Sequence, residues 1–400
     1  MEDFFLQLVI ILLSARVLGE LAGRFGIPSV VGELCAGVLL GPSLLNWIAP
    51  SETIKLLAEV GVVLLLFEVG LETDLAKLSK TGLKPFIAAM GGVVAPFVFG
   101  YLIAYNLFQL DLLTSLFIGS TLTATSIGIT VRVLNDLKRQ QSDEAQIVLG
   151  AAVIDDIIGV VLLALLYEFS MGGGINFINA GKVLLFISIF LITAPIAAKL
   201  ISGTIRRYDA VSEIPGLLPT TIVSLLLFFA WLSHQVGAPE LLGGFAAGLA
   251  LSRQFFLPLA AFIHESREFS HRVESQMKPI VHLFTPIFFV TVGLSLNLQE
   301  VNFSSGYIWI LSGLLIVAAV LGKLAAGWVL FKESKWVRMA VGLAMIPRGE
   351  VGLIFAEVGK NGGIFNQDLY AAMIIVITVT TLFTPFVLKA FYHRFGSKIV

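Results

Sequence analysis

Two adjacent carboxyl groups lie in the middle of a long apolar stretch of the sequence. Asp155 and Asp156 follow Ala-Ala-Val-Ile and precede Ile-Ile-Gly-Val-Val. A separate apolar stretch contains one lysine, Lys323, directly after a glycine. Ionisable side chains at membrane depth are energetically costly and usually mark a functional pathway. We therefore expect these three side chains to carry the chemistry of the protein.

The three side chains could exchange a cation for protons. Adjacent helix residues point about 100° apart, so one carboxylate can meet Lys323 while the other faces a cavity. A small hard cation prefers oxygen ligands, and a proton binds the same carboxylate oxygens. If the two compete for one site, binding of either releases the other. A purely structural salt bridge is disfavoured, because it would leave the second carboxyl group buried and protonated.

Polar residues also interrupt two other apolar segments. Thr125 and Ser126 lie in a hydroxyl-rich segment, whereas Arg348 and Glu350 belong to the run Pro-Arg-Gly-Glu. Proline removes a backbone donor, and unwound backbone at membrane depth is tolerated only inside protein or along a cavity. We expect two broken helices, in which Thr125 and Ser126 add oxygen ligands and Arg348 and Glu350 neutralise helix ends. Ordinary Pro and Gly kinks are the alternative.

The composition places these segments in a membrane. Of 400 residues, 57% are hydrophobic and 13% are charged, whereas a soluble domain has about 25% charged residues. The net charge of −1 and the lack of a basic stripe exclude a nucleic-acid partner. A span needs roughly 20 apolar residues, and the sequence predicts thirteen such spans, at 4–23, 28–48, 54–72, 83–108, 112–135, 145–171, 179–203, 216–236, 239–256, 278–298, 305–331, 338–359 and 368–390.

The distribution of Lys and Arg predicts how these spans are oriented. Connections after odd-numbered spans carry most of the basic residues, whereas those after even-numbered spans carry only Lys55, Lys182 and Lys360. Cytoplasmic loops are enriched in Lys and Arg. We therefore expect a multi-pass protein of a cell membrane with its N-terminus outside and its C-terminus in the cytoplasm.

An internal repeat predicts the architecture. The segment 32–40 parallels 243–251 with its glycines in register, and Val-Gly-Leu at 69–71 parallels Val-Gly-Leu at 292–294. The copies lie about seven spans apart, an odd number, so the second copy is inverted. Inverted repeats with interrupted helices at corresponding positions are typical of transporters. We expect an all-α membrane protein with two inverted six-helix repeats and the span at 179–203 as a linker.

Several motifs together make the chain similar to the monovalent cation:proton antiporter-2 family, in particular to its NapA-like sodium/proton antiporters. The specific part is the Asp-Asp pair with the later Gly-Lys, because electroneutral relatives typically have Asn-Asp there and glutathione-gated potassium systems Gln-Asp. The motifs that carry the resemblance are Val31-Gly32-Glu33 through Gly41-Pro42, Phe67 to Glu72, Ala124 to Thr130, Ile154-Asp155-Asp156, Gly322-Lys323 and Pro347 to Glu350.

The resemblance implies a role for each candidate residue. Asp156 would be the main carrier of cation and proton, and Asp155 would pair with Lys323 and exchange a proton as the cation enters. Na⁺ would bind at Asp156, Asp155 and Thr125, with Ser126 lining the crossing. The family's exchange is electrogenic, moving more protons than cations, and it uses no cofactor besides the transported Na⁺, Li⁺ or K⁺ and H⁺.

The resemblance also implies a division into a moving core and a fixed scaffold that forms a homodimer in the lipid bilayer. The cell membrane would be a prokaryotic inner membrane, and we expect no regulatory nucleotide-binding domain. The expected parts are a scaffold at 1–77 and 208–300, a core at 78–171 and 301–400, and a linker helix at 172–207.

Other functions remain as alternatives. K⁺/H⁺ exchange on the same scaffold stays open, because side-chain identity does not set selectivity. An ion channel would not need a titrating triad. An enzyme is not expected, since an intramembrane aspartyl protease needs two carboxyl groups from separate helices. We interpret the remaining membrane acids as interfacial, snorkelling or dimer-contact residues, namely Glu33, Glu59, Glu68 and Glu357.

Overall fold

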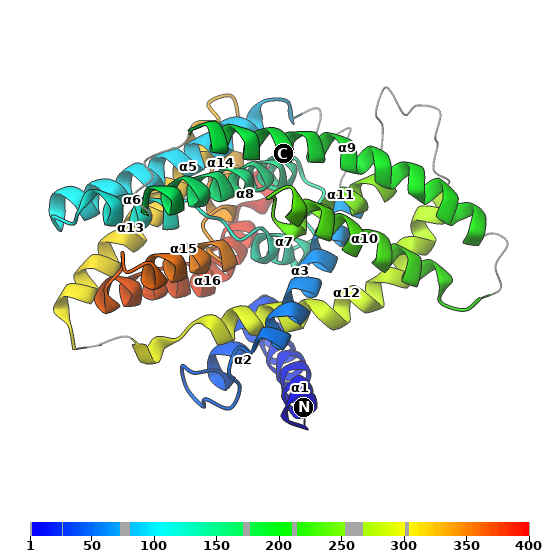
Figure 1. The fold of residues 1–400 in the computed structure, drawn as a ribbon, viewed down its shortest axis with the longest axis horizontal. Coiled ribbons are helices and arrows are strands. Elements are labelled where there is room, and N and C mark those ends of the chain that lie inside the picture. Colours follow the sequence, from blue (N-terminus) through cyan, green and yellow to red (C-terminus); the bar gives the residue numbers. More distant parts are fainter. Residues whose placement is uncertain are drawn as a thin grey trace. The chain divides into compact units, whose positions relative to one another are not determined.

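A computed structural model describes residues 2–25, 27–72, 81–170, 177–209, 214–252, 267–300 and 304–399. Over these residues the chain forms helices and connections, with no strand among them (Figure 1). It divides into two compact units. Unit 1 comprises Met1–Pro50, Leu83–Ala180 and Phe289–Val400, and unit 2 comprises Ser51–Gly82 and Gly181–Phe288.

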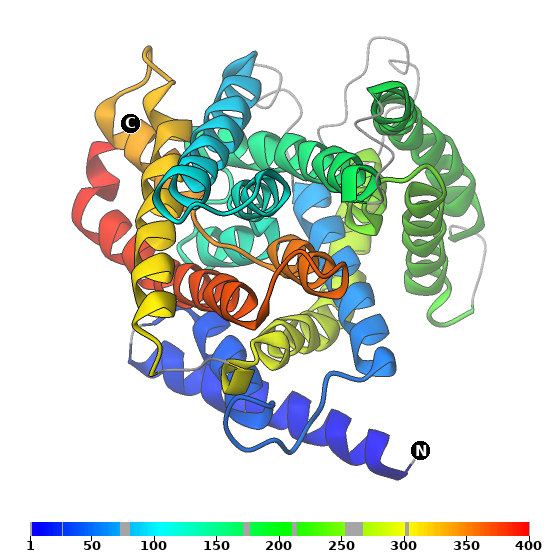
Figure 2. The same cartoon turned by 60° about the vertical axis from the view of Figure 1, so that its left-hand side comes forward.

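Unit 1 contains most of the helices. They are α1 (Glu2–Arg24), α2 (Ser29–Leu40), α5 (Lys84–Leu102), α6 (Leu112–Thr121), α7 (Ile127–Asp136), α8 (Asp143–Ser170), α13 (Gly306–Trp328), α14 (Lys335–Ala344), α15 (Glu350–Asn361) and α16 (Gln367–Phe395). Within this unit, α13 packs against α5, α14 and α16, and α15 packs against α6 and α16 (Figures 1 and 2).

Polar side chains begin several of these helices. Asp111 accepts a hydrogen bond from Thr114 N at the start of α6. The side chains of Ser305, Ser334 and Asn366 likewise each accept a hydrogen bond from a backbone N–H in the first turn of their own helix, at the starts of α13, α14 and α16. Each side chain satisfies one of the backbone N–H groups that a helix leaves without a partner in its first turn.

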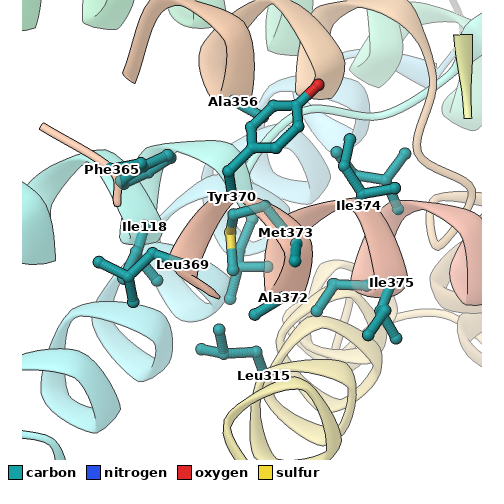
Figure 3. Close-up of a cluster of buried hydrophobic side chains, with 14 of the residues drawn as sticks. Ile118, Leu315, Ala356, Phe365, Leu369, Tyr370, Ala372, Met373, Ile374 and Ile375 are labelled. Atoms are coloured by element: carbon teal, nitrogen blue, oxygen red, sulfur yellow. The ribbon is translucent and has the colours of Figure 1, made fainter. Parts of the chain in front are cut away.

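An apolar cluster holds α6, α13, α15 and α16 together. Leu369 and Met373 of α16 lie among Ile118 of α6, Leu315 of α13 and Ala356 of α15, all buried (Figure 3). Because this cluster connects both halves of the chain in unit 1, it fixes the helices that carry the polar residues described below.

Unit 2 contains α3 (Glu52–Glu72), α10 (Leu217–Gln235) and α11 (Glu240–Leu251), together with most of α9 (Phe177–Asp209) and α12 (Arg267–Ser295). Glycines let α3 and α11 approach closely. A Cβ on Gly244 would collide with Val63 O, and one on Gly248 would collide with Phe67 O. Small residues of this kind let helix backbones approach in membrane proteins.

The repeated glycine motifs occupy similar packing positions in the two units. In α2, Gly32 lies against the backbone of Leu18 in α1 and Gly37 against Val290 in α12. The corresponding glycines of α11 lie against α10 and α3, at Phe229 and Phe67 respectively. This correspondence supports the inverted repeat, which stays a prediction.

The thirteen predicted spans each coincide with a helix or with a pair of helices. Eight described helices are long and apolar enough to cross a membrane by themselves, whereas α2 and α11 are shorter apolar helices. The number of crossings therefore stays a prediction. Two boundaries differ clearly. The helix α2 ends at Leu40 rather than at 48. The helix α12 begins at Arg267 rather than at 278, because it includes a charged segment that precedes its apolar part.

Candidate functional site

Two breaks in the helices of unit 1 lie against each other. Residues 122–126 separate α6 from α7, and residues 345–349 separate α14 from α15. Ser126 N donates a hydrogen bond of 2.8 Å to Pro347 O, and Thr125 Oγ1 donates one of 3.3 Å to Met345 O. The two unwound segments thereby give each other hydrogen-bond partners in place of those that a continuous helix would have provided.

The close approach of the two breaks requires a glycine. A Cβ at Gly349 would lie 2.6 Å from Ser126 Oγ and 2.7 Å from Ser126 Cβ. Pro347, two residues earlier, provides no backbone N–H, so it suits a segment that is not helical. The local sequence Pro-Arg-Gly therefore explains both why the chain unwinds here and how it fits against Ser126.

Arg348 lies at the crossing of the two breaks and is fully buried. Its Nη1 donates to Ala124 O, at the end of the α6 half, and its own carbonyl accepts a hydrogen bond from Thr381 Oγ1. A guanidinium beside a helix C-terminus compensates the partial negative charge of the free carbonyls. Glu350 begins α15, but its side chain lies outside the described part of the structure.

The predicted carboxylates and lysine come together on α8 and α13. Lys323 Nζ lies 3.0 Å from Asp155 Oδ2, and the two side chains are 0% and 1% exposed. Asp156, the next residue of α8, is 4% exposed. Among the described residues, Asp155 Oδ1 has no hydrogen-bond partner.

The position of Lys323 depends on its glycine neighbour. A Cβ at Gly322 would lie 2.6 Å from the backbone of Pro96 in α5. The Gly-Lys sequence therefore lets α13 and α5 touch and places the lysine beside α8, which also packs on α5.

Buried carboxylate and hydroxyl oxygens, which suit a small cation, occur on α8 and in the α6–α7 break of unit 1. Asp155, Asp156, Thr125 and Ser126 are all buried and come from α8 and from the α6–α7 break. Oxygen donors of this type suit a hard cation such as Na⁺ better than a transition metal. Their functional roles stay predictions.

A second ion pair, in which the acid is buried, was not predicted from the sequence. Glu33 in α2, which we interpreted as an interfacial, snorkelling or dimer-contact residue, is buried and lies 3.5 Å from the partly exposed Arg132 in α7. Arg132 also donates to Ser29 Oγ over 3.2 Å, and Ser29 Oγ donates to Asp136 over 3.2 Å. The spacing of Arg132 and Asp136 by four residues was a visible signal, but nothing local pointed to α2.

The other membrane acids differ from one another in exposure. Glu59 and Glu357 are exposed, whereas Glu68 is buried at 9% exposure. The interpretation of Glu59 and Glu357 as interfacial, snorkelling or dimer-contact residues stays a prediction.

The chain is similar to known membrane antiporters over almost its whole length. The family model "Sodium/hydrogen exchanger, transmembrane" matches residues 8–393. The "Na(+)/H(+)-K(+) antiporter GerN" of Bacillus cereus is 33% identical over 401 residues, covering 99% of this chain and 97% of that protein. The "High-affinity Na(+)/H(+) antiporter NhaS3" of a Synechocystis strain is 33% identical over 432 residues, covering 98% of this chain and 90% of that protein.

Among solved structures, the chain is similar to the sodium proton antiporter MjNhaP1 from Methanocaldococcus jannaschii. The TM-score is 0.76 at 16% sequence identity, covering 100% of this chain and 98% of that one. At this identity the similarity establishes the fold alone, an all-helical antiporter fold.

Proposed function

Because the chain belongs to the sodium/hydrogen exchanger family, we propose that it exchanges Na⁺ or Li⁺ for protons at the buried carboxylates of α8. The chain is a membrane antiporter for cations and protons, and thus a transporter rather than an enzyme. The observation that carries the specific proposal is the ion pair of Asp155 and Lys323, with Asp156 next to it.

The ion pair suggests how a cation releases protons. With no cation bound, Lys323 neutralises Asp155, and Asp156 holds a proton. Na⁺ binding at Asp156 and Asp155, with Thr125 as a further oxygen ligand, displaces the proton of Asp156 and separates Lys323 from its partner. An unpaired buried ammonium is costly by several kcal/mol, so Lys323 then releases a proton as well.

This sequence makes the exchange electrogenic. More than one proton is released for each monovalent cation that binds, so each cycle moves net charge. The dissociable groups are Asp156 and Lys323, and both are buried. Membrane potential should therefore drive transport as well as the pH difference.

Alternating access completes the proposal. The core, at 78–171 and 301–400, would carry the ion site in an elevator-like movement against a scaffold at 1–77 and 208–300, and two scaffolds would pair in a homodimer. The two breaks are hydrogen-bonded to each other, from Ser126 to Pro347 and from Arg348 to Ala124. These bonds support a core in which the two breaks move together with the ion site. The membrane would be a cell membrane, with the N-terminus outside.

K⁺/H⁺ exchange is the second candidate. The printed name of the Bacillus cereus relative includes K⁺ beside Na⁺, and oxygen ligands accept both cations. The two candidates share the same residues and differ only in the cation that the site prefers.

Exchange in proteoliposomes with an imposed pH difference tests the proposal, with Na⁺, Li⁺ and K⁺ compared. We expect Na⁺ and Li⁺ to drive proton flux, and we expect Asp156→Asn to reduce that flux to background. Asp143→Asn is the matched control, because Asp143 lies exposed in the first turn of the same helix. Sodium-driven flux that survives Asp156→Asn would contradict the proposal, and equal or faster exchange with K⁺ would favour the second candidate.

A further inference from the structure

A pocket of about 570 Å³ opens where α13 ends and α14 begins. Part of its lining is apolar, namely Trp328 and Val329 at the end of α13 and Met339 of α14. The lining also includes two cations, Lys335 and Arg338. No residue of the candidate ion site lines this pocket.

The cations of the pocket are not neutralised by the acid nearest in sequence. Glu333 forms an ion pair of 2.8 Å with Lys84. Arg338 Nη2 donates to Trp328 O over 2.7 Å, and its guanidinium lies 5.7 Å from the centre of the Phe331 ring. In the part of the chain that the structure describes, the buried Arg338 Nε has no hydrogen-bond partner. The pocket therefore keeps positive charge, and the buried Nε lies beneath its surface.

Large apolar side chains are exposed at the edge of the same pocket. Trp328 is 49% exposed and Phe331 is 81% exposed. Such side chains are stable beside lipid at the level of the headgroups, where Trp is enriched. The connection from α13 to α14 lies on the side that the distribution of Lys and Arg predicts to be cytoplasmic, and cytoplasmic leaflets carry anionic lipids.

We propose that this pocket binds the headgroup of an anionic phospholipid from the cytoplasmic leaflet. The lipid phosphate lies between the charged ends of Lys335 and Arg338, and an acyl chain runs along Trp328 and Val329. The apolar part of the lining distinguishes a lipid from free phosphate, because a soluble anion would gain nothing from it. The excess of positive charge distinguishes an anionic lipid from a zwitterionic one.

Thermal unfolding of the purified full chain in detergent tests this site. The added probes are dioleoyl phosphatidylglycerol, dioleoyl phosphatidylcholine and soluble glycerol phosphate. The site variant is Lys335→Gln with Arg338→Gln, and the single variant Lys335→Gln serves if the double variant does not fold. The matched control is Lys138→Gln with Lys278→Gln, which removes two exposed charges predicted to lie on the same side.

We expect phosphatidylglycerol to stabilise the wild type and the control, with phosphatidylcholine and glycerol phosphate having little effect. Each basic side chain near an anionic lipid contributes roughly fivefold in affinity, so the double variant should need roughly 30-fold more lipid for the same shift. An equal shift in the wild type and the site variants would overturn the proposal. So would an equal shift with phosphatidylcholine or with glycerol phosphate. None of these outcomes depends on transport activity.

Discussion

At the scale of single residues, the ion pair of Asp155 and Lys323 is the feature that folding alone does not explain. The two side chains are almost fully buried. Removing two charges from water costs several kcal/mol per ion, and well-packed apolar residues of similar volume are often at least as stable in the same place. The exchange proposed above gives the pair a reason to be there.

The pair predicts a specific pattern of stabilities. Lys323→Ala leaves the Asp155 carboxylate buried without its cation, so we expect a loss of about 3–5 kcal/mol in the free energy of unfolding. Asp155→Asn together with Lys323→Ala removes both charges and should restore much of that loss. Denaturant unfolding in detergent measures both variants.

The transport assay adds a readout that a merely structural pair would not affect. Lys323→Ala should shift the pH profile of exchange, since a proton carrier has been removed. If Lys323→Ala and the double variant were equally stable, and the pH profile stayed that of the wild type, the ion pair would not exist as described.

The sequence allowed the residues of this pair to be identified, but it did not allow the pair of Glu33 and Arg132 to be found. Asp155 and Lys323 are isolated charges in apolar stretches, so each needs a partner and few are available. Arg132 has Asp136 four residues later on α7, which already explains its charge locally. Only the tertiary packing of α2 on α7 brings Glu33 to it.

At the scale of elements, glycines set the distances between helices. In unit 2, Gly70 of α3 faces the backbone of Phe245, while Gly244 and Gly248 of α11 face the backbone of α3. The three glycines lie on both helices of one interface, so no larger side chain fits on either side. Lipid tails are as apolar as the helices, so such packing replaces the hydrophobic effect as the source of association.

This packing predicts the effect of one methyl group. A Cβ at Gly248 would collide with the Phe67 carbonyl oxygen, which is backbone and cannot move aside easily. We expect Gly248→Ala to lower the free energy of unfolding by about 1–3 kcal/mol. The matched control is Gly203→Ala in α9, where a Cβ meets nothing within 4 Å. Equal stability of Gly248→Ala and Gly203→Ala in thermal unfolding would refute the close approach.

The start of α6 predicts a dependence on pH. Burial raises the pKa of Asp111, whereas the side-chain and backbone hydrogen bonds with Thr114 lower it. The hydrogen bonds together have the larger effect, so the pKa of Asp111 lies below its usual value. Its carboxylate therefore stabilises the folded chain above the unfolded pKa of about 3.9, and this contribution disappears as the pH falls through the lower folded value.

Replacement of the cap should show this dependence directly. We expect Asp111→Ala to lose about 0.5–1 kcal/mol at pH 7, because an N-cap partner is removed, and to differ less from the wild type near pH 3. Asp111→Asn keeps an acceptor without a titrating charge and is the control. The melting temperature across this pH range is the measurement, and a difference that grows toward low pH would have the wrong sign.

The breaks show how far element boundaries could be predicted. Pro347 and Gly349 marked the second break. The first break contains no proline, and its position at 122–126 is set by hydrogen bonds such as Ser126 N to Pro347 O. The long α12 was predicted too short, because apolar length indicates the part of a helix that crosses a bilayer and not where the helix itself begins.

At the scale of the whole molecule, composition and charge determined the class of protein before any contact was known. Low charge required a membrane, and the alternation of basic connections predicted the orientation. Helix length was less decisive: α2 and α11 have 12 residues each, which rise only about 18 Å against a bilayer core of about 30 Å. Hydropathy alone therefore predicts some membrane spans that are longer than the single helix found there.

The division of the chain into these two units could not be predicted from the sequence either. The contacts assign α1 and α2 to unit 1, together with the helices that carry the candidate ion site. The resemblance had assigned residues 1–77 to the scaffold. Contacts describe packing in one arrangement, whereas core and scaffold are defined by movement, and that definition stays a prediction.

The central claim is that a cation and protons compete for Asp155, Asp156 and Lys323. Calorimetric titration of the purified chain with NaCl, in two buffers of different ionisation enthalpy, counts the protons released for each Na⁺ bound. The account predicts more than one proton per Na⁺ in the wild type, the wild-type number in Asp143→Asn, and no measurable sodium-linked release in Asp156→Asn. Sodium binding without any release of protons would contradict it.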